Sequence, residues 1–475
     1  MLSNAIIKNK INSEYPMKRT IKYIVLGLMG VAMTSCHIYK PYELPTDNAY
    51  VQKYAESAEA HPDSASLPFL SWEQVFTDPT LQGYIRTALD NNKDLDDARL
   101  NIQIAQSQLK GAKLSYFPSV ALNPNGAGAK YQDMGKMNWS YQIPLAVNWE
   151  IDVFAKILNR KRGAKVSVEQ MEDYRQAVQS QIICGVANTY YALMLLHQQL
   201  GLATRTSEIW KDQVESMKLM KEAGWVNEAA VVQSEANYWS IMASIPEIKQ
   251  SIHEMNNTMS LLLHEYPKEW TVSQNMDFNL PVDIAKGVPV SYLAARPDIR
   301  AAERGLAAAY YTTNSARAAF YPGLSVSANG GFTNLLGSMV SNPGKFFIQL
   351  AGSLAAPLFS RGQNIANLEV AKTRQKIAMN NFEKSVLSAS ADVSDALSRY
   401  ANYEDKYKNL EKQVNSLEKS VEYTQELLTL DSNTTYLEVI TARSGLLNAQ
   451  IASLNCWHSK VSALISIYQA VGGGR

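Results

Sequence analysis

The hydrophobic pattern of the chain is most regular at residues 138–153, where apolar and polar positions alternate. One set of positions is apolar: Trp139, Tyr141, Ile143, Leu145, Val147, Trp149, Ile151 and Val153. The intervening positions are polar or small: Asn138, Ser140, Gln142, Pro144, Ala146, Asn148, Glu150 and Asp152. Because successive side chains of a strand point to opposite faces, this pattern predicts a strand with one apolar and one polar face. Ordinary strands have about 5–6 residues, so this strand is predicted to be unusually long.

Two windows of the chain favour very long helices. None of the 17 prolines lies between Pro144 and Pro246 or after Pro357, and both windows are rich in helix-forming residues. Within the second window, residues in steps of three and four indicate a coiled-coil seam. They are Tyr400, Tyr403, Tyr407, Leu410, Val414, Leu417, Val421, Thr424 and Leu428. At about 1.5 Å per residue, a helix of about 65 residues would be roughly 100 Å long.

The chain is internally duplicated. Pro118 corresponds to Pro322 at an offset of 204, and the long alternating strand corresponds to FFIQLAGSLAAPLFS at an offset of 205. Each half is predicted to contain helices, a strand, a turn, a second strand and a long helix pair. The first repeat covers residues 71–270, with strands at about 117–126 and 138–152. The second covers 271–475, with strands at about 322–333 and 346–358.

The length and alternation of these strands match transmembrane β-strands. A sheet in lipid cannot leave an edge open, and bacterial barrels have at least about 8 strands. Four strands per chain therefore predict a barrel shared between protomers, and two, three or four copies would all suffice. The alternative is a sheet outside the membrane with one face covered by helices.

The N-terminus resembles a bacterial export signal that ends in a lipobox. Lys18, Arg19 and Lys22 precede the apolar run 23–33, which is shorter than the ~20 residues of a transmembrane helix. We expect residues 1–35 to be a signal peptide, with Met17 as the start if 1–16 are an over-annotated extension. Small residues precede Cys36, which we expect to be acylated; the alternative is an incidental cysteine. Four prolines then predict an extended, non-helical arm over residues 36–70.

Composition argues against nucleic-acid binding and against catalysis. The chain has 45 Lys and Arg against 44 Asp and Glu, so no basic excess is available for nucleic acid. HExxH, CxxC, Walker and GxSxG motifs are absent, and six scattered histidines do not form a zinc pattern. We therefore expect no enzyme activity, no metal and no cofactor except the covalent lipid. Cys184 and Cys456 lie in apolar helical sequence and are expected to be buried free thiols.

Several motifs, in this order on this repeat, carry a family resemblance. They are YKPYELP after Cys36, WEQVFTDPTLQGYIRTALDNNKDL from Trp72, WEIDVFAK from Trp149, RPDIRAAE from Arg296, ARAAFYPGLSVSA from Ala316 and APLFSRGQNIANLEVA from Ala356. The chain resembles the outer-membrane factors of tripartite efflux pumps, the TolC-like family, and within it the lipidated OprM/NodT-like branch.

The resemblance implies a mainly helical fold class with a membrane β-barrel. A homotrimer would form one 12-stranded barrel in the outer membrane, continued by a helical tunnel through the periplasm. The tunnel would meet a periplasmic adaptor (membrane fusion) protein and an inner-membrane pump of the resistance-nodulation-division (RND) type. The chain would be a passive exit duct for small molecules such as drugs. The alternatives are a lipid-anchored coiled-coil scaffold or adhesin, and a conduit for protein secretion.

The resemblance also places a gate near the tip of the second helix pair. Glu438 matches the first acidic residue of the family's gate ring. Thr441 stands where a second acid is found, and Thr434 where a basic residue is found. These two departures imply a weaker acidic ring, and Asp431 is a further gate candidate. Asp392 and Asp395 are instead expected to be surface charges or interhelical contacts.

The two helix-pair tips are the expected docking points for the adaptor. The first tip is Ala223, Gly224, Trp225 and Val226, where Gly224 permits the chain reversal. The second tip is Asp431, Ser432, Asn433, Thr434 and Thr435. The RPDIRAAE motif is interpreted as structural, because Pro297 suits a first helical turn and Asp298 the positive helix end. Its charged residues Arg296, Arg300 and Glu303 are expected to form ion pairs.

Overall fold

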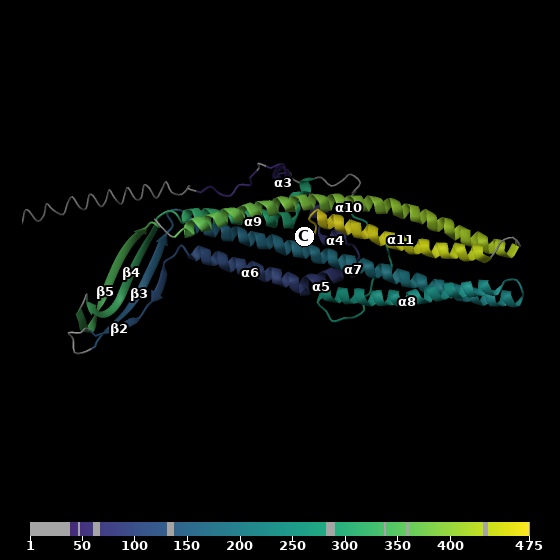
Figure 1. Ribbon diagram of the computed structural model, residues 1–475, viewed down its shortest axis with the longest axis horizontal. Helices are drawn as coiled ribbons and strands as arrows, with labels where there is room; N and C mark the ends of the chain where they lie inside the picture. Colours follow the sequence, from purple (N-terminus) through teal and green to yellow (C-terminus); the bar gives the residue numbers. More distant parts are fainter. Residues whose placement is uncertain are drawn as a thin grey trace, which may run out of the picture. The chain divides into compact units, whose positions relative to one another are not determined.

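The computed structural model describes residues 39–45, 48–59, 67–130, 137–281, 290–336, 339–357, 361–430 and 436–474 (Figure 1). The signal segment, Cys36 and the second tip at 431–435 lie outside these residues. The chain divides into two compact units. Unit 1 comprises the segment up to Leu44, Ile102–Gln170 and Ala302–Asn381; unit 2 comprises Pro45–Asn101, Met171–Ala301 and Phe382–Arg475. The units do not coincide with the two sequence repeats, since each unit takes segments from both.

Unit 1 contains an antiparallel sheet in the order β1-β3-β4-β5, with β2 also paired to β3. The strands are β1 (Ser119–Leu122), β2 (Asn125–Ala129), β3 (Asn138–Ile151), β4 (Gly323–Leu336) and β5 (Met339–Ala355). The long alternating segment is thus one strand, β3, of 14 residues.

The first predicted strand, at about 117–126, is divided into β1 and β2, which pair with successive stretches of β3. Pro124 lies at the break between them, and Pro144 lies at the matching point of β3. Neither proline can donate a hydrogen bond to the ladder, which explains the interruption. Because β1 and β2 lie end to end on β3, the chain contributes four strands across the sheet.

The last strand begins earlier than its sequence predicted. β5 starts at Met339 rather than near 346, although Pro343 and Gly344 lie within it. Met339 and Val340 pair with Leu336 and Leu335 of β4, and a register shift separates this pairing from the rest of the ladder. Pairing with β4 therefore overrides the local turn signal of proline and glycine.

The helices include two very long ones. α7 (Lys156–Glu222) has 67 residues and is followed by α8 (Glu228–Leu263); α10 (Gln363–Leu430) has 68 and is followed by α11 (Tyr436–Ala470). α6 (Lys93–Leu114) precedes the first strands, and α9 (Pro297–Ala318) precedes the second pair of strands. Helix α8 continues through Pro246 without a break.

One short helix corrects the prediction of an extended arm over residues 36–70. α3 (Ala49–Glu59) is helical, and the 3-10 helix η2 (Leu67–Phe69) follows it. The prolines of the arm lie outside α3, so the intervening sequence can form helical hydrogen bonds. Val51 and Tyr54, three residues apart, are buried, and the Tyr54 ring lies 5.2 Å from that of Phe382. Burial of this apolar stripe stabilises the helix.

The main core of unit 2 packs short helices α4 (Trp72–Val75) and α5 (Pro79–Asn91) against α7, α8 and α11. Asp78 caps α5 by accepting hydrogen bonds from the backbone N–H groups of Thr80 (2.8 Å) and Leu81 (3.2 Å). Its other carboxylate oxygen accepts the Tyr190 hydroxyl at 2.9 Å. Cys184 and Cys456 are buried free thiols, as predicted.

A single glycine tests the close pairing of β3 and β4. A Cβ added at Gly331 would overlap the carbonyl oxygen of Ile143, whereas one added at Gly352 would meet nothing. We expect Gly331→Ala to destabilise the protein by about 1–3 kcal/mol through overpacking, measured as a lower midpoint of thermal unfolding. Gly352→Ala in β5 is the matched control and should leave the midpoint within error. Equal midpoints for both variants would contradict the observed β3–β4 register.

Candidate functional site

The sheet of unit 1 exposes its apolar face. The register places Ile143, Phe332 and Phe346 side by side on neighbouring strands, as it does Trp149 and Val326. Trp139 is 66% exposed, Ile348 70% and Leu350 75%. Along β3, the polar positions 138, 140 and 142 are less exposed than the aromatic and aliphatic positions between them. A sheet packed in water shows the opposite pattern, because burial of its apolar face stabilises it.

The turn between α7 and α8 is closed by a glycine in the left-handed region. Gly224 has φ +74°, the Trp225 N–H donates to the Met220 carbonyl at 2.8 Å, and the Gly224 N–H to that of Lys221 at 3.0 Å. This pair of bonds is the Schellman motif, which satisfies the last carbonyl groups of a helix. Asn227 then caps α8 by accepting the Ala230 N–H at 3.1 Å.

The first predicted docking tip is therefore a well-defined turn that presents an aromatic ring. Trp225 is 79% exposed, and Val226 packs against the hydrophobic cluster below it. Ion pairs join the two helices behind the turn, Lys221 with Glu228, and Lys218 with Glu235 at 2.9 Å. These ion pairs were missed from the sequence, although the basic residues before Gly224 and the acidic residues after it could have indicated them.

The first two turns of α11 carry the gate candidates that the structure describes. Glu438 and Thr441 are both exposed, and the Thr441 hydroxyl donates to the Leu437 carbonyl at 2.8 Å. The opposite side of the helix, with Tyr436, Val439 and Ile440, is buried in a cluster with side chains of α7 and α8. The Glu438 carboxylate thus lies away from this cluster. Asp431 and Thr434 lie outside the described residues.

The RPDIRAAE motif forms a charged network, as predicted for two of its residues. Arg296 donates to Asp298 at 2.7 Å, to Asp392 at 3.0 Å and to the Ala470 carbonyl at 3.1 Å. Burial alone would lower the pKa of Arg296, but its hydrogen bonds to Asp298 and Asp392 outweigh burial and raise it. Arg300 donates to Asp173 at 2.8 Å. The network therefore links separate helices, and Asp392 takes part in it as an interhelical contact.

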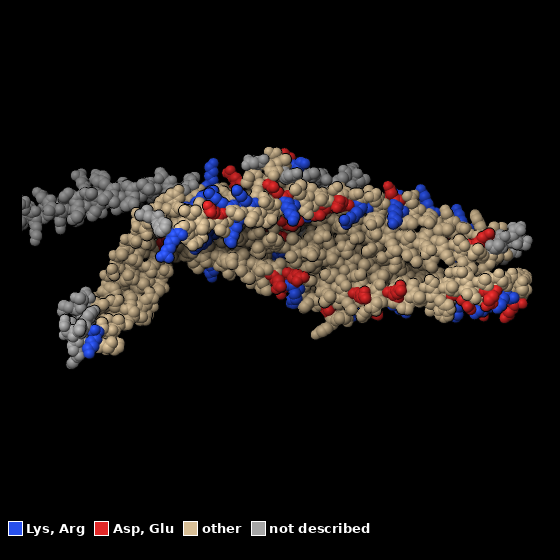
Figure 2. All heavy atoms as spheres, viewed as in Figure 1, with Lys and Arg blue, Asp and Glu red and all other residues tan. Residues whose placement is uncertain are grey.

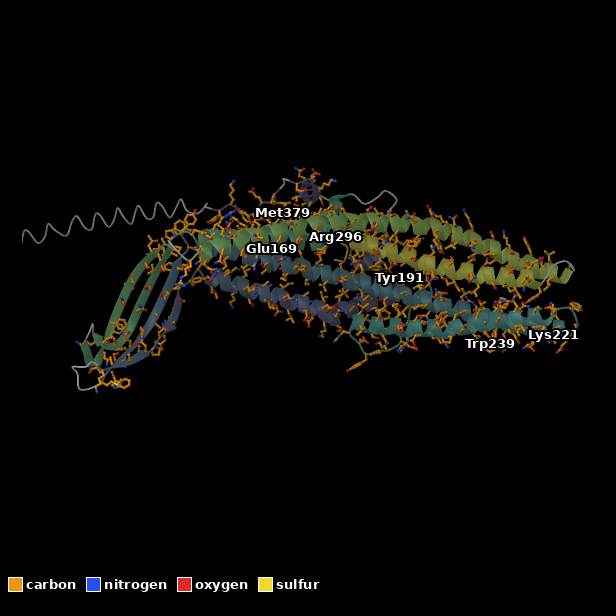
Figure 3. All side chains as sticks on the ribbon, viewed as in Figure 1. Glu169, Tyr191, Lys221, Trp239, Arg296 and Met379 are labelled. Atoms are coloured by element: carbon orange, nitrogen blue, oxygen red, sulfur yellow. The ribbon has the colours of Figure 1, made fainter. Side chains whose placement is uncertain are left out.

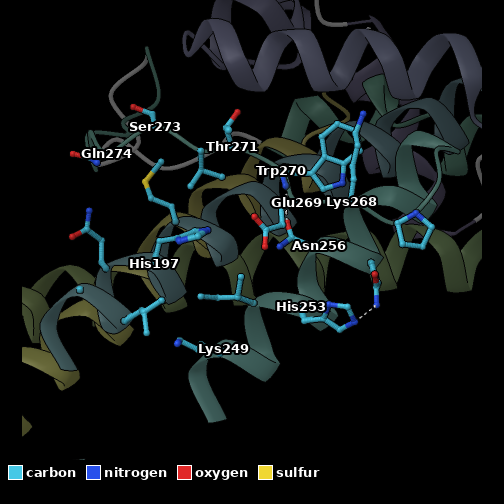
Figure 4. Close-up of a pocket in the computed structure, with 18 of the residues that line it drawn as sticks. His197, Lys249, His253, Asn256, Lys268, Glu269, Trp270, Thr271, Ser273 and Gln274 are labelled. Atoms are coloured by element: carbon cyan, nitrogen blue, oxygen red, sulfur yellow. Dashed lines mark hydrogen bonds between the residues drawn. The ribbon is translucent and has the colours of Figure 1, made fainter. Parts of the chain in front are cut away.

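A cleft of about 950 Å³ in unit 2 lies among α7, α8 and residues 267–274 (Figure 4). Several of its polar groups already have partners within the chain. Trp270 donates its indole N–H to Ser260 at 2.9 Å and its backbone N–H to Asn256 at 3.0 Å. The Lys268 ammonium lies 4.1 Å from the Trp270 ring centroid. Among the described residues, no three His, Cys, Asp or Glu side chains converge as metal ligands, here or elsewhere.

Within the described part of the chain, no helix is both long and apolar enough to cross a membrane.

Comparison with known proteins gives one consistent family. The model of the outer membrane efflux protein family matches residues 84–263 and 288–473. The cation efflux system protein CusC of Escherichia coli is 26% identical over 453 residues, which cover 94% of this chain and 97% of CusC. The toluene efflux pump outer membrane protein TtgC of Pseudomonas putida is 25% identical over 475 residues, 96% of each chain.

Solved structures agree in fold. The open state of the MtrE outer membrane channel of Neisseria gonorrhoeae matches with a TM-score of 0.78 and 25% identity, covering 92% of this chain and 97% of MtrE. The fold is that of the outer membrane efflux channels: a mainly helical, duplicated chain with a membrane β-sheet, which builds a trimeric barrel continued by a helical tunnel. The chain belongs to the outer membrane efflux protein family and is an outer-membrane channel subunit of a tripartite efflux system, extending into the periplasm.

Proposed function

We propose that three copies of this chain form a passive exit duct for small molecules such as drugs. The duct receives its cargo from an inner-membrane RND pump through a periplasmic adaptor protein. The observation that carries the proposal is the exposed apolar face of the sheet beside a less exposed polar face. Lipid against the apolar face would cover the apolar side chains that one chain leaves exposed, and water on the other face would solvate its polar side chains.

The edges of the sheet explain why one chain is not enough. β5 forms one edge, and β1 and β2 form the other, so backbone groups on both edges lack partners within the described sheet. In hydrocarbon each unsatisfied group costs several kcal/mol, so the edges must pair with other strands. Neighbouring copies supply these strands, and three copies of four strands give a 12-stranded barrel. Transport through such a duct is diffusion, so the chain performs no chemistry and needs no cofactor.

The N-terminal arm supports acylation of Cys36. The Tyr39 carbonyl accepts Arg162 of α7 at 3.5 Å, the Lys40 carbonyl accepts the Tyr310 hydroxyl at 3.2 Å, and the Tyr42 N–H donates to the Tyr311 hydroxyl at 3.1 Å. These bonds hold the arm against the helices of the sheet-bearing unit. Cys36 is three residues upstream, within about 10 Å of Tyr39 for an extended chain. Acyl chains there would reach the same bilayer as the sheet.

The mass of the detergent-extracted protein tests the shared barrel. Light scattering corrected for bound detergent should give the mass of three mature protomers, because four strands cannot close alone. A stable monomer would sink the shared barrel and favour a lipid-anchored coiled-coil scaffold.

Mass spectrometry of the same preparation tests the lipid. We expect a chain that begins at Cys36 and carries the added mass of acyl chains, whereas a Cys36→Ala variant should lack that mass and still form trimers. An unmodified Cys36 would refute the anchor and leave the barrel proposal standing.

The gate proposal assigns one carboxylate per protomer to the narrowest part of the tunnel. Glu438 stands on the exposed side of α11, so three copies would form an acidic ring, to which Asp431 adds if the tip turns inward. Thr441 and Thr434 supply hydroxyl groups where the family has an acid and a base. A ring of carboxylates attracts cations and raises their concentration in a narrow pore.

Single-channel recording tests this ring. We expect Glu438→Gln to reduce the preference for cations over anions, because three charges leave the constriction, and Thr441→Asp to increase that preference. Glu247→Gln, which removes another exposed carboxylate, on α8, is the matched control. Reversal potentials that do not differ between Glu438→Gln and the control would place the gate elsewhere.

The adaptor docks at both tips in this proposal, at 223–226 and 431–435. The exposed Trp225 on its well-defined turn is the first candidate anchor, because aromatic side chains contribute strongly at interface centres. We expect Trp225→Ala to weaken capture of the periplasmic adaptor protein by about tenfold or more, measured by surface plasmon resonance. Trp239→Ala removes an indole of α8 that is 63% exposed and should bind like the wild type. Equal binding by both variants would remove the first tip from the docking surface.

A further inference from the structure

Charge is distributed unevenly between the two units. The chain as a whole is balanced, with 45 Lys and Arg against 44 Asp and Glu. The described part of unit 1, which holds the membrane sheet, has sixteen Lys and Arg against six Asp and Glu. Figure 2 shows basic side chains gathered on the helices where they join the sheet. A basic excess next to a membrane-spanning element attracts anionic lipid.

Part of this excess lies where the apolar face of the sheet ends. Trp149, near the end of β3, donates its indole N–H to the Tyr116 carbonyl at 2.9 Å. The Lys161 ammonium of α7 lies 5.5 Å from the Tyr116 ring centroid. Lys113, in the last turn of α6, accepts the Tyr116 N–H with its carbonyl and is exposed. Aromatic rings with neighbouring cations are typical of the boundary between hydrocarbon and headgroups.

Two more cations, on α7 and α9, lie beside the N-terminal arm at the same place. Arg162 follows Lys161 and donates to the Tyr39 carbonyl. Burial raises the pKa of Tyr39, and Arg317 of α9 is close enough to oppose that rise. Arg317 also donates to the Asn314 side chain at 3.0 Å and remains exposed. We call Lys113, Lys161, Arg162 and Arg317 the junction patch.

The carboxylates of this region have hydrogen-bond or ion-pair partners outside the junction patch. Asp152 caps α7 by accepting the N–H groups of Ile157 (3.0 Å) and Leu158 (2.7 Å). Glu150, on the polar face of β3, pairs with Lys156 at 2.8 Å, and Glu169 pairs with Lys165 and Arg304. Within the described residues, no ion pair joins a carboxylate to the junction patch. Its charge is therefore available to an anionic ligand.

We propose that the junction patch binds the phosphate headgroups of anionic phospholipids in the periplasmic leaflet of the outer membrane. The acyl chains of the same lipids would lie along the apolar face that begins at Trp149. Continuity between cations and exposed apolar strands favours a lipid, because a free anion would use only the cations. The inference rests on the membrane placement of the sheet and is independent of the gate and of the cargo.

Lipid titration of the purified full-length trimer tests the proposal. Native mass spectrometry would follow binding of phosphatidylglycerol, with phosphatidylethanolamine as the zwitterionic reference. Each cation beside an anionic surface changes affinity by roughly fivefold. We expect the triple variant Lys161→Gln, Arg162→Gln, Arg317→Gln to lose the preference for phosphatidylglycerol by up to roughly a hundredfold. The control triple Lys211→Gln, Lys249→Gln, Lys412→Gln removes three exposed cations of unit 2 and should keep the preference.

A second, milder variant keeps the proposal testable if the triple variant misfolds. Lys113→Gln with Lys161→Gln removes two charges and no side-chain hydrogen bond among the described residues, and it should lose part of the preference with an unchanged trimer mass. Equal loss in the control triple, or no preference in the wild type, would overturn the proposal. Displacement of the lipid by an equal concentration of inorganic phosphate would also overturn it, because the site would then recognise a free anion. A monomeric wild type would instead indicate failure of the shared barrel.

Discussion

The rest of this structure depends on the requirement that every backbone polar group in lipid finds a partner within protein. β3 and β4 are paired on both sides over most of their length, but the two edges of the sheet are not. A chain with four strands across its sheet cannot meet the requirement alone. Oligomerisation is then a condition for inserting the sheet at all. This separates the chain from proteins that fold as monomers and later associate through complementary surfaces.

The same constraint explains the contrast between strands and helices. The edge strands lack hydrogen-bond partners for part of their backbone within the described sheet. Their sequence pattern is regular because each position faces either lipid or water. The long helices satisfy their own backbone groups, and their stability comes from packing along one stripe. Figure 3 shows side chains along the full length of these helices, with Trp239 and Lys221 on the α7–α8 pair. Gly224 and Asn227 close that pair without strain, so the reversal is encoded locally.

Features encoded by local periodicity were predictable from the sequence, and those that depend on distant contacts were less so. Alternation alone identified β3, and the absence of proline identified α7 and α10. The helix α3 was missed because prolines on both sides of it dominated the local composition, whereas its stability comes from burial of Val51 and Tyr54. The early start of β5 was missed because its partner β4 stabilises a segment with proline and glycine. Of the site, the sequence indicated Gly224 by its conformational freedom, but the roles proposed for Glu438 and the tips came from family resemblance.

The junction patch shows why an overall charge balance is a poor guide to local electrostatics. The near-zero net charge argued against nucleic acid, but it is the average over a basic unit and an acidic one. Segments from three separate parts of the sequence meet in unit 1, so no window of the chain displays their combined charge. A passive duct needs few strong contacts with its cargo, since tight binding would slow release. Unpaired charge on the outside of such a protein is therefore better explained by the membrane that holds it than by the molecules that pass through it.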